Sequence, residues 1–378
     1  MIYFDNSATT KIDNEVLKEV IETMNNNFAN ASSLHRLGYE AEQKIVNSKK
    51  TIANIIGAKE DEIYFTAGGT ESNNIAIFGA CDAYKKYGNK IITTKIEHPS
   101  VLKCFNELEN RGFEVCYLDV DNKGYIDIDN LINQIDDNTI FVSIMYVNNE
   151  IGTIQKIDEI GKKIKEKNKN TIFHTDAVQA FGKLKINVKY IDLMSVSGHK
   201  IHAQKGIGFL YVKSGIRLNN IIFGAGQQKG IRSGTINNEG IIGICKASQI
   251  AYENLDENFE KIYKIKKEII GLKDKIENMY INGDEENGIP YILSLSFKDV
   301  KGEVLLHSLE DKGIFVSTGS ACGSKGKKDL STIHYVNENN VGSTIRVSFS
   351  FDNTLEEAKQ FNETILNIIP ILRMYTKR

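Results

Sequence analysis

The chain has 378 residues, of which 41% are hydrophobic and 25% charged, and its formal net charge is −2. These proportions are typical of a globular protein with one large or two modest domains, and the near-balance of charge argues against a nucleic-acid-binding or membrane-binding surface. No apolar run approaches the length of a membrane-spanning helix and Met1 leads into Ile2-Tyr3-Phe4-Asp5 without a signal peptide, so we expect a cytoplasmic protein.

A short N-terminal strand and a loop lead into alternating helices and strands as far as residue 211. Hydrophobic periodicity predicts helices over residues 14–25, 39–56, 70–87, 99–111, 131–134 and 157–167. Apolar runs rich in β-branched residues predict strands over residues 62–66, 90–95, 114–118, 139–146, 171–175, 191–197 and 207–211. This alternation indicates βαβ units, and we therefore expect an α/β fold with a mostly parallel sheet.

The pattern changes beyond residue 238. A helical pattern runs from residue 238 to about 279, which is long enough to bridge two lobes. Strands over 291–297, 314–317 and 344–349 and helices over 303–312 and 355–372 follow, and they predict a smaller α+β unit. We place the boundary near residue 255, with a large domain formed by residues 13–255 and a small domain formed by residues 1–12 and 256–378.

The turn after the strand at 191–197 carries the most informative residues. Gly198 ends the strand, and Ser197, His199 and Lys200 lie together on the turn. A lysine just past a buried strand is partly desolvated, which lowers its pKa and makes its amine a usable nucleophile. Pyridoxal phosphate needs such a lysine and a nearby hydroxyl to anchor its phosphate. Taken alone, a lysine in this position is more often an ordinary surface residue.

Other polar groups follow the predicted strands, at the edge where open parallel sheets bind ligands. Gly68-Gly69-Thr70 follows the strand at 62–66, and a glycine-rich helix start favours an anion. Asp176 ends the strand at 171–175 and could keep a pyridine nitrogen protonated, while Gln179 could bond a ring oxygen. An ordinary helix cap is the alternative interpretation of both stretches.

His98 and Asn149 follow two further strands, at 90–95 and 139–146. A histidine there could stack on an aromatic ring and transfer protons, and an asparagine could bond a cofactor or a substrate carboxylate. Each residue taken singly is more often structural. Their recurrence after successive strands, together with a lysine nucleophile, favours a single ligand site at the carboxyl edge of the sheet.

The five cysteines include no CxxC pair and no spacing typical of zinc, so we predict neither a disulfide framework nor a metal site. Those in apolar, regular contexts are interpreted as core thiols: Cys81, Cys104, Cys116 and Cys245. Cys322 differs because it lies in the small-residue stretch 317–326, and the lysines that follow would lower its thiol pKa. A surface cysteine without a role is an equal alternative.

Several motifs carry a family resemblance. They are Tyr3-Phe4-Asp5-Asn6-Ser7-Ala8-Thr9-Thr10, Gly69-Thr70-Glu71-Ser72-Asn73-Asn74, Glu97-His98, Val147-Asn148-Asn149-Glu150-Ile151-Gly152, Thr175-Asp176-Ala177-Val178-Gln179, Ser197-Gly198-His199-Lys200, Arg232-Ser233-Gly234-Thr235, Ser317-Thr318-Gly319-Ser320-Ala321-Cys322 and Ile345-Arg346. With these motifs in order, the chain resembles the cysteine desulfurases of the NifS/IscS type, which are class V, fold-type I pyridoxal-phosphate enzymes. The resemblance implies that fold, with the cysteine loop on the small domain.

The resemblance also implies how each candidate residue would contact pyridoxal 5'-phosphate. Lys200 would hold the cofactor covalently, and Asp176 would pair with its pyridine nitrogen. Gln179 would bond the ring oxygen, His98 would stack on the ring and transfer protons, and Asn149 would contact cofactor and substrate. The phosphate would be bound by Thr70, Ser197, His199 and, from the other subunit of a homodimer, Thr235.

The reaction that the resemblance implies uses L-cysteine. Asn149 and Arg346 would hold its carboxylate, Arg346 in the bidentate way that suits a guanidinium. The Cys322 thiolate would attack the substrate sulfur, which releases L-alanine and leaves a persulfide for an iron–sulfur scaffold or a tRNA-thiolation enzyme. Lys200, Cys322 and His98 are thus the candidate catalytic residues. The alternatives are a selenocysteine lyase or another class V reaction, and a non-catalytic sulfur-relay subunit.

The chain departs from the family pattern in four loops, and in one of them Gly323 follows Cys322 where Thr or Ser is commoner. Ala203-Gln204-Lys205-Gly206 stands where Gly-Pro-Lys-Gly is usual, Ala29-Asn30-Ala31-Ser32 where Gly-Asn-Pro-Ser is usual, and Gly224-Ala225-Gly226-Gln227-Gln228 where Gly-Gly-Gly-Gln-Glu is usual. These changes remove no reactive group. The missing Pro and Gly residues affect the rigidity of the turn that carries Lys200 and of the loop at 224–228, which the resemblance places near the dimer contact.

Overall fold

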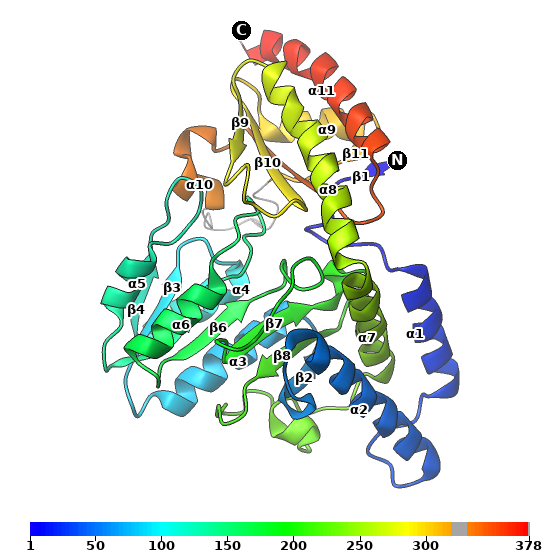
Figure 1. Ribbon diagram of the computed structural model, residues 1–378, viewed down its shortest axis with the longest axis vertical. Helices are drawn as coiled ribbons and strands as arrows, with labels where there is room; N and C mark the ends of the chain where they lie inside the picture. The colour runs from blue at the N-terminus through cyan, green and yellow to red at the C-terminus, as the bar shows by residue number, and fades with distance from the viewer. Residues whose placement is uncertain (319–330, 377–378) are drawn as a thin grey trace.

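The computed structural model describes residues 1–318 and 331–376 (Figure 1). Its large sheet has seven strands in the order β2-β8-β7-β6-β5-β3-β4. β8 runs antiparallel to its neighbours β2 and β7, and the other neighbours are parallel, which confirms the predicted α/β fold. The strands are β2 (Ile63–Thr66), β3 (Lys90–Thr94), β4 (Glu114–Leu118), β5 (Thr139–Ser143), β6 (Ile172–Asp176), β7 (Leu193–Ser197) and β8 (Gly208–Val212).

Helices cover both faces of the large sheet. Ile91 and Phe141 belong to the hydrophobic cluster that contains α3 and α4, whereas their neighbours Ile92 and Val142 belong to the cluster that contains α2, α6 and α7. Because successive side chains of a strand point to opposite faces, strands buried on both faces consist of continuous apolar runs. The helices are α1 (Asn14–Asn26), α2 (Arg36–Ile56), α3 (Gly69–Tyr84), α4 (Pro99–Asn110), α5 (Ile128–Gln134), α6 (Ile157–Lys167) and α7 (Asn238–Glu253).

The helical pattern beyond residue 238 forms two helices and a strand. α7 ends at Glu253, and α8 (Leu255–Ile270) begins after Asn254, whose ψ of 22° is not helical. The sequence predicts that the helix continues to residue 279, but Met279–Asn282 forms strand β9, which pairs with β10 (Ile292–Phe297). Pairing between strands outweighs local periodicity in this short segment. The division of the chain into domains near residue 255 stays a prediction.

The smaller part of the molecule lies above the large sheet in Figure 1. Its sheet consists of β9, β10 and β12 (Thr344–Ser348), with β10 in the centre and antiparallel to both neighbours. α9 (Gly302–Glu310) and α11 (Leu355–Thr376) pack together beside α8 and this sheet. The short helix α10 (Thr332–Val336) was not predicted from the sequence.

The N-terminal segment joins the two parts. β1 (Ile2–Tyr3) pairs in parallel with β11 (Ile314–Phe315), and the Phe4 ring packs edge-to-face on Phe349 with 5.2 Å between the centroids. The chain then crosses to the large sheet, where the Asp13 side chain caps α1 by accepting from the first backbone N–H groups of that helix. Among the helices of the described residues, none is long and apolar enough to cross a membrane.

Candidate active site

The carboxyl ends of the large sheet border a cavity of about 410 Å³. β6 ends at Asp176, and β7 ends at Ser197, directly before a 3-10 turn over Gly198–Lys200. His98 caps α4, because its Nδ1 accepts a hydrogen bond from the backbone N–H of Ser100 at 3.2 Å. This is the edge at which open parallel sheets bind ligands.

Most of the site residues predicted from the sequence line this cavity. They are Thr70, His98, Asn149, Asp176, Gln179, Ser197, His199, Lys200 and Arg346. Thr235 is exposed and is not part of the lining formed by the described residues of one chain. Cys322 lies outside the described residues.

Lys200 is held against the N-terminal segment. Its Nζ donates hydrogen bonds to the carbonyl oxygens of Ser7 and Ala8, the latter at 2.7 Å. Thr10 fixes the lysine turn, because its backbone N–H and its hydroxyl both donate to the carbonyl oxygen of His199, at 2.9 and 3.0 Å. Main-chain carbonyl groups therefore hold the amine at the wall of the cavity.

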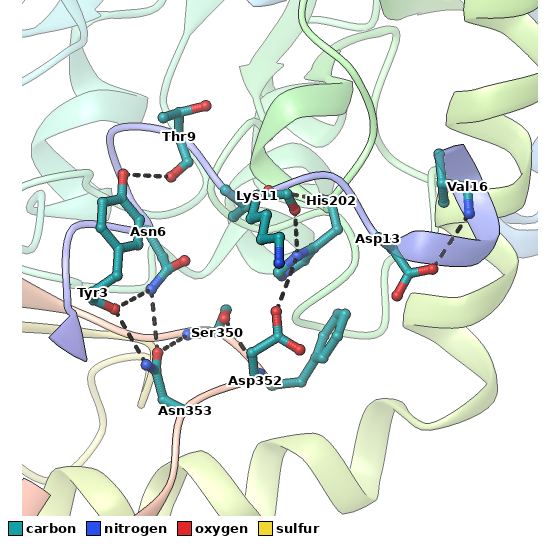
Figure 2. A network of polar contacts seen from close by, with 12 residues as sticks. Tyr3, Asn6, Thr9, Lys11, Asp13, Val16, His202, Ser350, Asp352 and Asn353 are labelled. Atoms are coloured by element: carbon teal, nitrogen blue, oxygen red, sulfur yellow. Dashed lines mark hydrogen bonds and ion pairs between the residues drawn. The ribbon is translucent and has the colours of Figure 1, made fainter. Parts of the chain in front are cut away.

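Figure 2 shows how the N-terminal segment is anchored on both sides. The Asn6 side-chain amide donates to Asn353 Oδ1 in the smaller part at 3.2 Å. His202, just after the lysine turn, has a φ of 66°, and its Nδ1 lies 2.9 Å from the carbonyl oxygen of Lys11 and 3.8 Å from Asp352 Oδ2. The wall of the cavity is thus tied to both parts of the molecule.

A chain of hydrogen bonds joins Asp176 to His98. Asp176 Oδ2 accepts from Asn73 Nδ2 at 2.7 Å, and Oδ1 accepts from the backbone N–H of Val178 at 3.0 Å. The Asn73 amide also donates to Ser100 Oγ at 2.8 Å, and that oxygen lies 2.8 Å from His98 Nδ1. Burial lowers the pKa of His98, although the negative charge of Asp176 opposes the effect. The neutral form of the ring is therefore favoured.

The N-terminus of α3 forms another side of the cavity. A Cβ on Gly69 would lie 2.7 Å from Val178 Cγ2, so glycine is required for α3 to begin this close to the turn after β6. Thr70 and Ser197 line the cavity here, where free backbone N–H groups favour an anion. Burial and the charge of neighbouring lysines lower the pKa of His199 to about 4, so this ring is neutral at pH 7.

Arg346, on β12, brings a guanidinium to the cavity. Its Nη1 donates to the carbonyl oxygen of Asn149 and its Nη2 to Asp5 Oδ1, both at 2.9 Å. Glu150 also lines the cavity, and burial raises its pKa to about 7 although the charge of Arg346 opposes the shift. A carboxylate ligand would therefore meet a guanidinium that its acceptors have already oriented.

Several lining residues belong to the sequence motifs but were not predicted as site residues. Asp5, Ser7 and Ala8 reach the cavity from the N-terminal segment, and Ser317 and Thr318 reach it from the residues after β11. The Asp5 contact joins residues that are 341 positions apart in sequence. Local spacing holds no signal for such a contact.

The cavity fits pyridoxal phosphate. It offers a lysine amine for covalent attachment, a buried carboxylate for the pyridine nitrogen, and a helix N-terminus with hydroxyl groups for the phosphate. Its volume lies in the range of about 300–1,000 Å³ that small-molecule sites occupy. Within residues 1–318 and 331–376, no group of three or more His, Cys, Asp or Glu side chains is placed to hold a metal ion.

Known proteins resemble this chain over nearly its whole length. The aminotransferase class-V family model matches residues 2–361. A cysteine desulfurase IscS of Clostridium botulinum is 42% identical over 376 residues, which cover 97% of this chain and 94% of that protein. A solved structure of a NifS-like protein has a TM-score of 0.92 at 35% identity, with 98% of this chain and 99% of that chain covered.

A second solved structure, of SspA in complex with cysteine, has a TM-score of 0.81 at 31% identity and covers 92% of this chain and 99% of that chain. The match to the family model and the identity to these relatives extend across both the large sheet and the smaller part of the molecule. The chain therefore belongs to the aminotransferase class-V family, among the relatives of the NifS/IscS type.

Proposed function

We propose that this protein is a cysteine desulfurase, which removes sulfur from L-cysteine with the help of pyridoxal 5'-phosphate and releases L-alanine. The observation that carries the proposal is the meeting of Lys200, Asp176 and Arg346 in one cavity. They supply an attachment point, a partner for the pyridine nitrogen and a clamp for an amino-acid carboxylate. Relatives named cysteine desulfurase, and a related structure with cysteine, support the same reaction.

The cofactor would be held by groups from several elements. Lys200 would bind it through Nζ, Asp176 would keep the pyridine nitrogen protonated, and Gln179 would donate to the ring oxygen. The hydrogen bond from Asn73 supports the Asp176 carboxylate in this role. The phosphate would be bound by Thr70, Ser197, His199 and Thr235 of the partner subunit.

Asn149 and Arg346 would orient the substrate by its carboxylate. The bound cofactor supplies an electron sink for the carbon that loses its proton. We assign removal of the Cα proton to Lys200. His98 is assigned to proton donation, because the backbone N–H of Ser100 occupies its Nδ1, and the neutral ring then carries its proton on Nε2.

Cys322 is assigned as the nucleophile for sulfur. Its thiolate would form an S–S bond with the substrate sulfur. The C–S bond would break at the same time, and its electron pair would stay on the substrate carbon. The other thiols are poorer candidates, because burial raises the pKa of each and keeps it protonated. They are Cys81, Cys104, Cys116 and Cys245.

We further propose a cytoplasmic homodimer that passes its persulfide to an iron–sulfur scaffold or a tRNA-thiolation enzyme. Large apolar side chains are exposed on the described surface, at Phe28, Leu34 and Tyr39 before and at the start of α2 and at Phe223 in the loop that precedes Thr235. Burial against a second copy would remove this apolar surface from water, which supports association of two copies. The domain division at residue 255 is part of the same proposal.

Incubation of the purified protein with L-cysteine tests the function. We expect a yellow protein that forms L-alanine and protein-bound persulfide in equal amounts in a first turnover without reductant, and sulfide when a reductant is added. Alanine formed from selenocysteine but not from cysteine would favour the selenocysteine lyase. A protein that binds the cofactor yet forms neither product would contradict both reactions.

A further inference from the structure

Lys183 is a buried lysine in the turn that follows β6. Backbone hydrogen bonds from Phe181 to Ala177 and from Lys183 to Ala180 shape this turn, and they place Lys183 one helical turn after Gln179. Gly182 has a φ of 75°, and a Cβ there would lie 2.7 Å from Ile201 Cγ2. The turn is therefore packed closely enough to exclude a side chain at 182, and it carries the Lys183 side chain into the interior.

The contacts of the Lys183 amine are few. The residue is 6% exposed, and its Nζ donates a hydrogen bond to Gln179 Oε1 at 2.9 Å. The ring centroid of Tyr291 lies 5.8 Å from Nζ, within the range of a cation–π contact. Lysine amines are seldom buried, because removing the charge from water is unfavourable unless other contacts compensate for it.

The charges around Lys183 are mainly positive. The charged side chains that lower its pKa are Lys200 and Arg346. Its own charge lowers the pKa of His199 and His202, and its amine lies over the ring of Tyr291. Burial, followed by the charges of Lys200 and Arg346, lowers the pKa of Lys183 to about 7. Its charged form is thus present in part at neutral pH.

The hydrogen bond from Lys183 determines which way the Gln179 amide points. In its ammonium form the amine can only donate, so it then pairs with Oε1 and leaves the Nε2 group on the other side of the amide. That group donates to the carbonyl oxygen of Ser7 at 3.0 Å, and Gln179 lines the active-site cavity. A flipped amide would place Nε2 against the amine and lose both hydrogen bonds.

We propose that Lys183 is a positioning residue for the cofactor: it fixes Gln179 with its N–H groups toward the ring oxygen and adds positive charge behind that amide. The inference rests on the proposed function, since it assumes that pyridoxal phosphate binds in this cavity. Both effects stabilise a negative ring oxygen. Such stabilisation would lower the pKa of the nitrogen that joins Lys200 to the cofactor.

The test is a pH titration of the visible absorption band of the holoenzyme. Replacing Lys183 with Met removes the donor and the charge and shortens the side chain by only one atom. We expect the midpoint of the titration to rise by about one pH unit, a tenfold change in proton affinity. Lys183→Gln, which stays polar, gives the same direction of shift if the Met variant does not fold.

Lys266→Met is the matched control. Lys266 is also buried, at 3% exposure, but it donates to the carbonyl oxygens of Gly288 and Ile289 in the smaller part of the molecule. Its removal should leave the midpoint unchanged. A shift of equal size in this variant would overturn the inference, because it would show a general effect of losing a buried amine.

A double-mutant cycle with Gln179→Leu separates positioning from charge alone. If Lys183 acts through Gln179, Lys183→Met should produce a smaller shift in the Gln179→Leu background than in the wild type. An equal shift in both backgrounds, or no shift in a folded Lys183→Met holoenzyme, would overturn the inference and leave the proposed function intact. A wild-type protein that takes up no cofactor would overturn both.

Discussion

Asp5 and Arg346 form an ion pair, with 2.9 Å between Oδ1 and Nη2, that joins the N-terminal segment to β12. The carboxylate compensates the guanidinium charge before any ligand arrives, and the carbonyl oxygen of Asn149 fixes the second amino group. A substrate carboxylate would therefore bind an arginine that is well oriented but partly neutralised. Changes at the two positions should then have opposite effects on substrate binding.

Arg346→Lys keeps the charge and removes the planar donor pair. We expect the KM for L-cysteine to rise by about 10- to 100-fold, because a hydrogen bond between charged groups contributes about 1.5–3 kcal/mol. Steady-state alanine formation measures the change, and an unaltered visible spectrum shows that the cofactor is still bound. Asp5→Asn, which keeps an acceptor for Nη2 but loses the charge, should lower KM by a few-fold. A KM that does not respond to Arg346→Lys would refute the carboxylate site.

Lys200→Ala should abolish covalent attachment of the cofactor. The amine lies at the cavity wall with the carbonyl oxygens of Ser7 and Ala8, which place it for attachment. Borohydride reduction and peptide mapping should recover the labelled adduct on Lys200 in the wild type and on no peptide of the variant. Lys205→Ala, which removes an exposed lysine of the same loop, is the control and should keep the adduct. An adduct on any other lysine would be inconsistent with the assignment.

Cys322→Ala should stop cysteine desulfuration and leave cofactor binding intact. Burial raises the pKa of the described thiols, to about 12 in Cys104, and so removes them as nucleophiles at neutral pH. Mass spectrometry after incubation with cysteine should find the extra sulfur on the peptide that contains Cys322. Cys116→Ala, at a half-buried thiol, should keep full activity. Sulfur on any of the other cysteines would point to a different carrier.

Glu97 should make the folded state less stable as the pH rises. Burial raises its pKa to about 8, although hydrogen bonds from Met145 N–H and Thr94 Oγ1 to its carboxyl group oppose the shift. The pKa of an unfolded glutamate is about 4.3, so the pKa of Glu97 is higher in the folded state. A carboxyl group of this kind contributes its full stabilisation below about pH 4.3, and the contribution is lost progressively as the pH rises to the folded pKa. The free energy of unfolding should therefore fall between about pH 5 and pH 8.

Glu97→Gln resembles the protonated acid and should remove that part of the pH dependence. Urea unfolding at pH 5, 7 and 9 measures it, with Glu363→Gln, an exposed change on α11, as the control. The Glu97→Gln protein should be more stable than the wild type at pH 9 and similar to it at pH 5. Parallel pH profiles for the wild type and Glu97→Gln would rule out a buried, protonated carboxyl group.

Leu34→Glu should weaken the dimer. Leu34 has a relative exposure of 104% in the single chain, so a charged residue there should leave the stability of the monomer unchanged. The same charge would be unfavourable if the position were buried against a second copy. Sedimentation velocity should show a shift toward the monomer and a parallel loss of activity if Thr235 completes the site of the partner. Met374→Glu, at an exposed position on α11, should change neither. A fully active wild-type monomer would exclude the composite site.

Most helices and strands follow from the sequence because their apolar spacing is regular. β3, predicted over 90–95, spans Lys90–Thr94, and α4, predicted over 99–111, spans Pro99–Asn110. α2 begins at Arg36, three residues earlier than predicted, because His35 Nδ1 accepts from the backbone N–H of Gly38. β9 and α10 were missed, since elements of four and five residues depend on tertiary contacts more than on local periodicity.

The residues at the strand ends could be proposed from the sequence because parallel strands bring their carboxyl ends to one edge. Asp5 could not, because its partner on β12 is distant in sequence. Lys183 could not either, because a lysine in a turn is normally exposed and nothing in its spacing indicates that its amine bonds Gln179. These contacts depend on the packing of the smaller part against the large sheet.

The pairing of β1 with β11 has a consequence for how the protein is made on the ribosome. Ser7 and Ala8, which hold Lys200, are synthesised about 300 residues before Ile314 and Arg346, by the numbering of the sequence. Contacts between such distant segments close large loops and form late. A nascent chain therefore carries an incomplete cavity until β12 has left the exit tunnel, and capture of the cofactor is expected to follow that point.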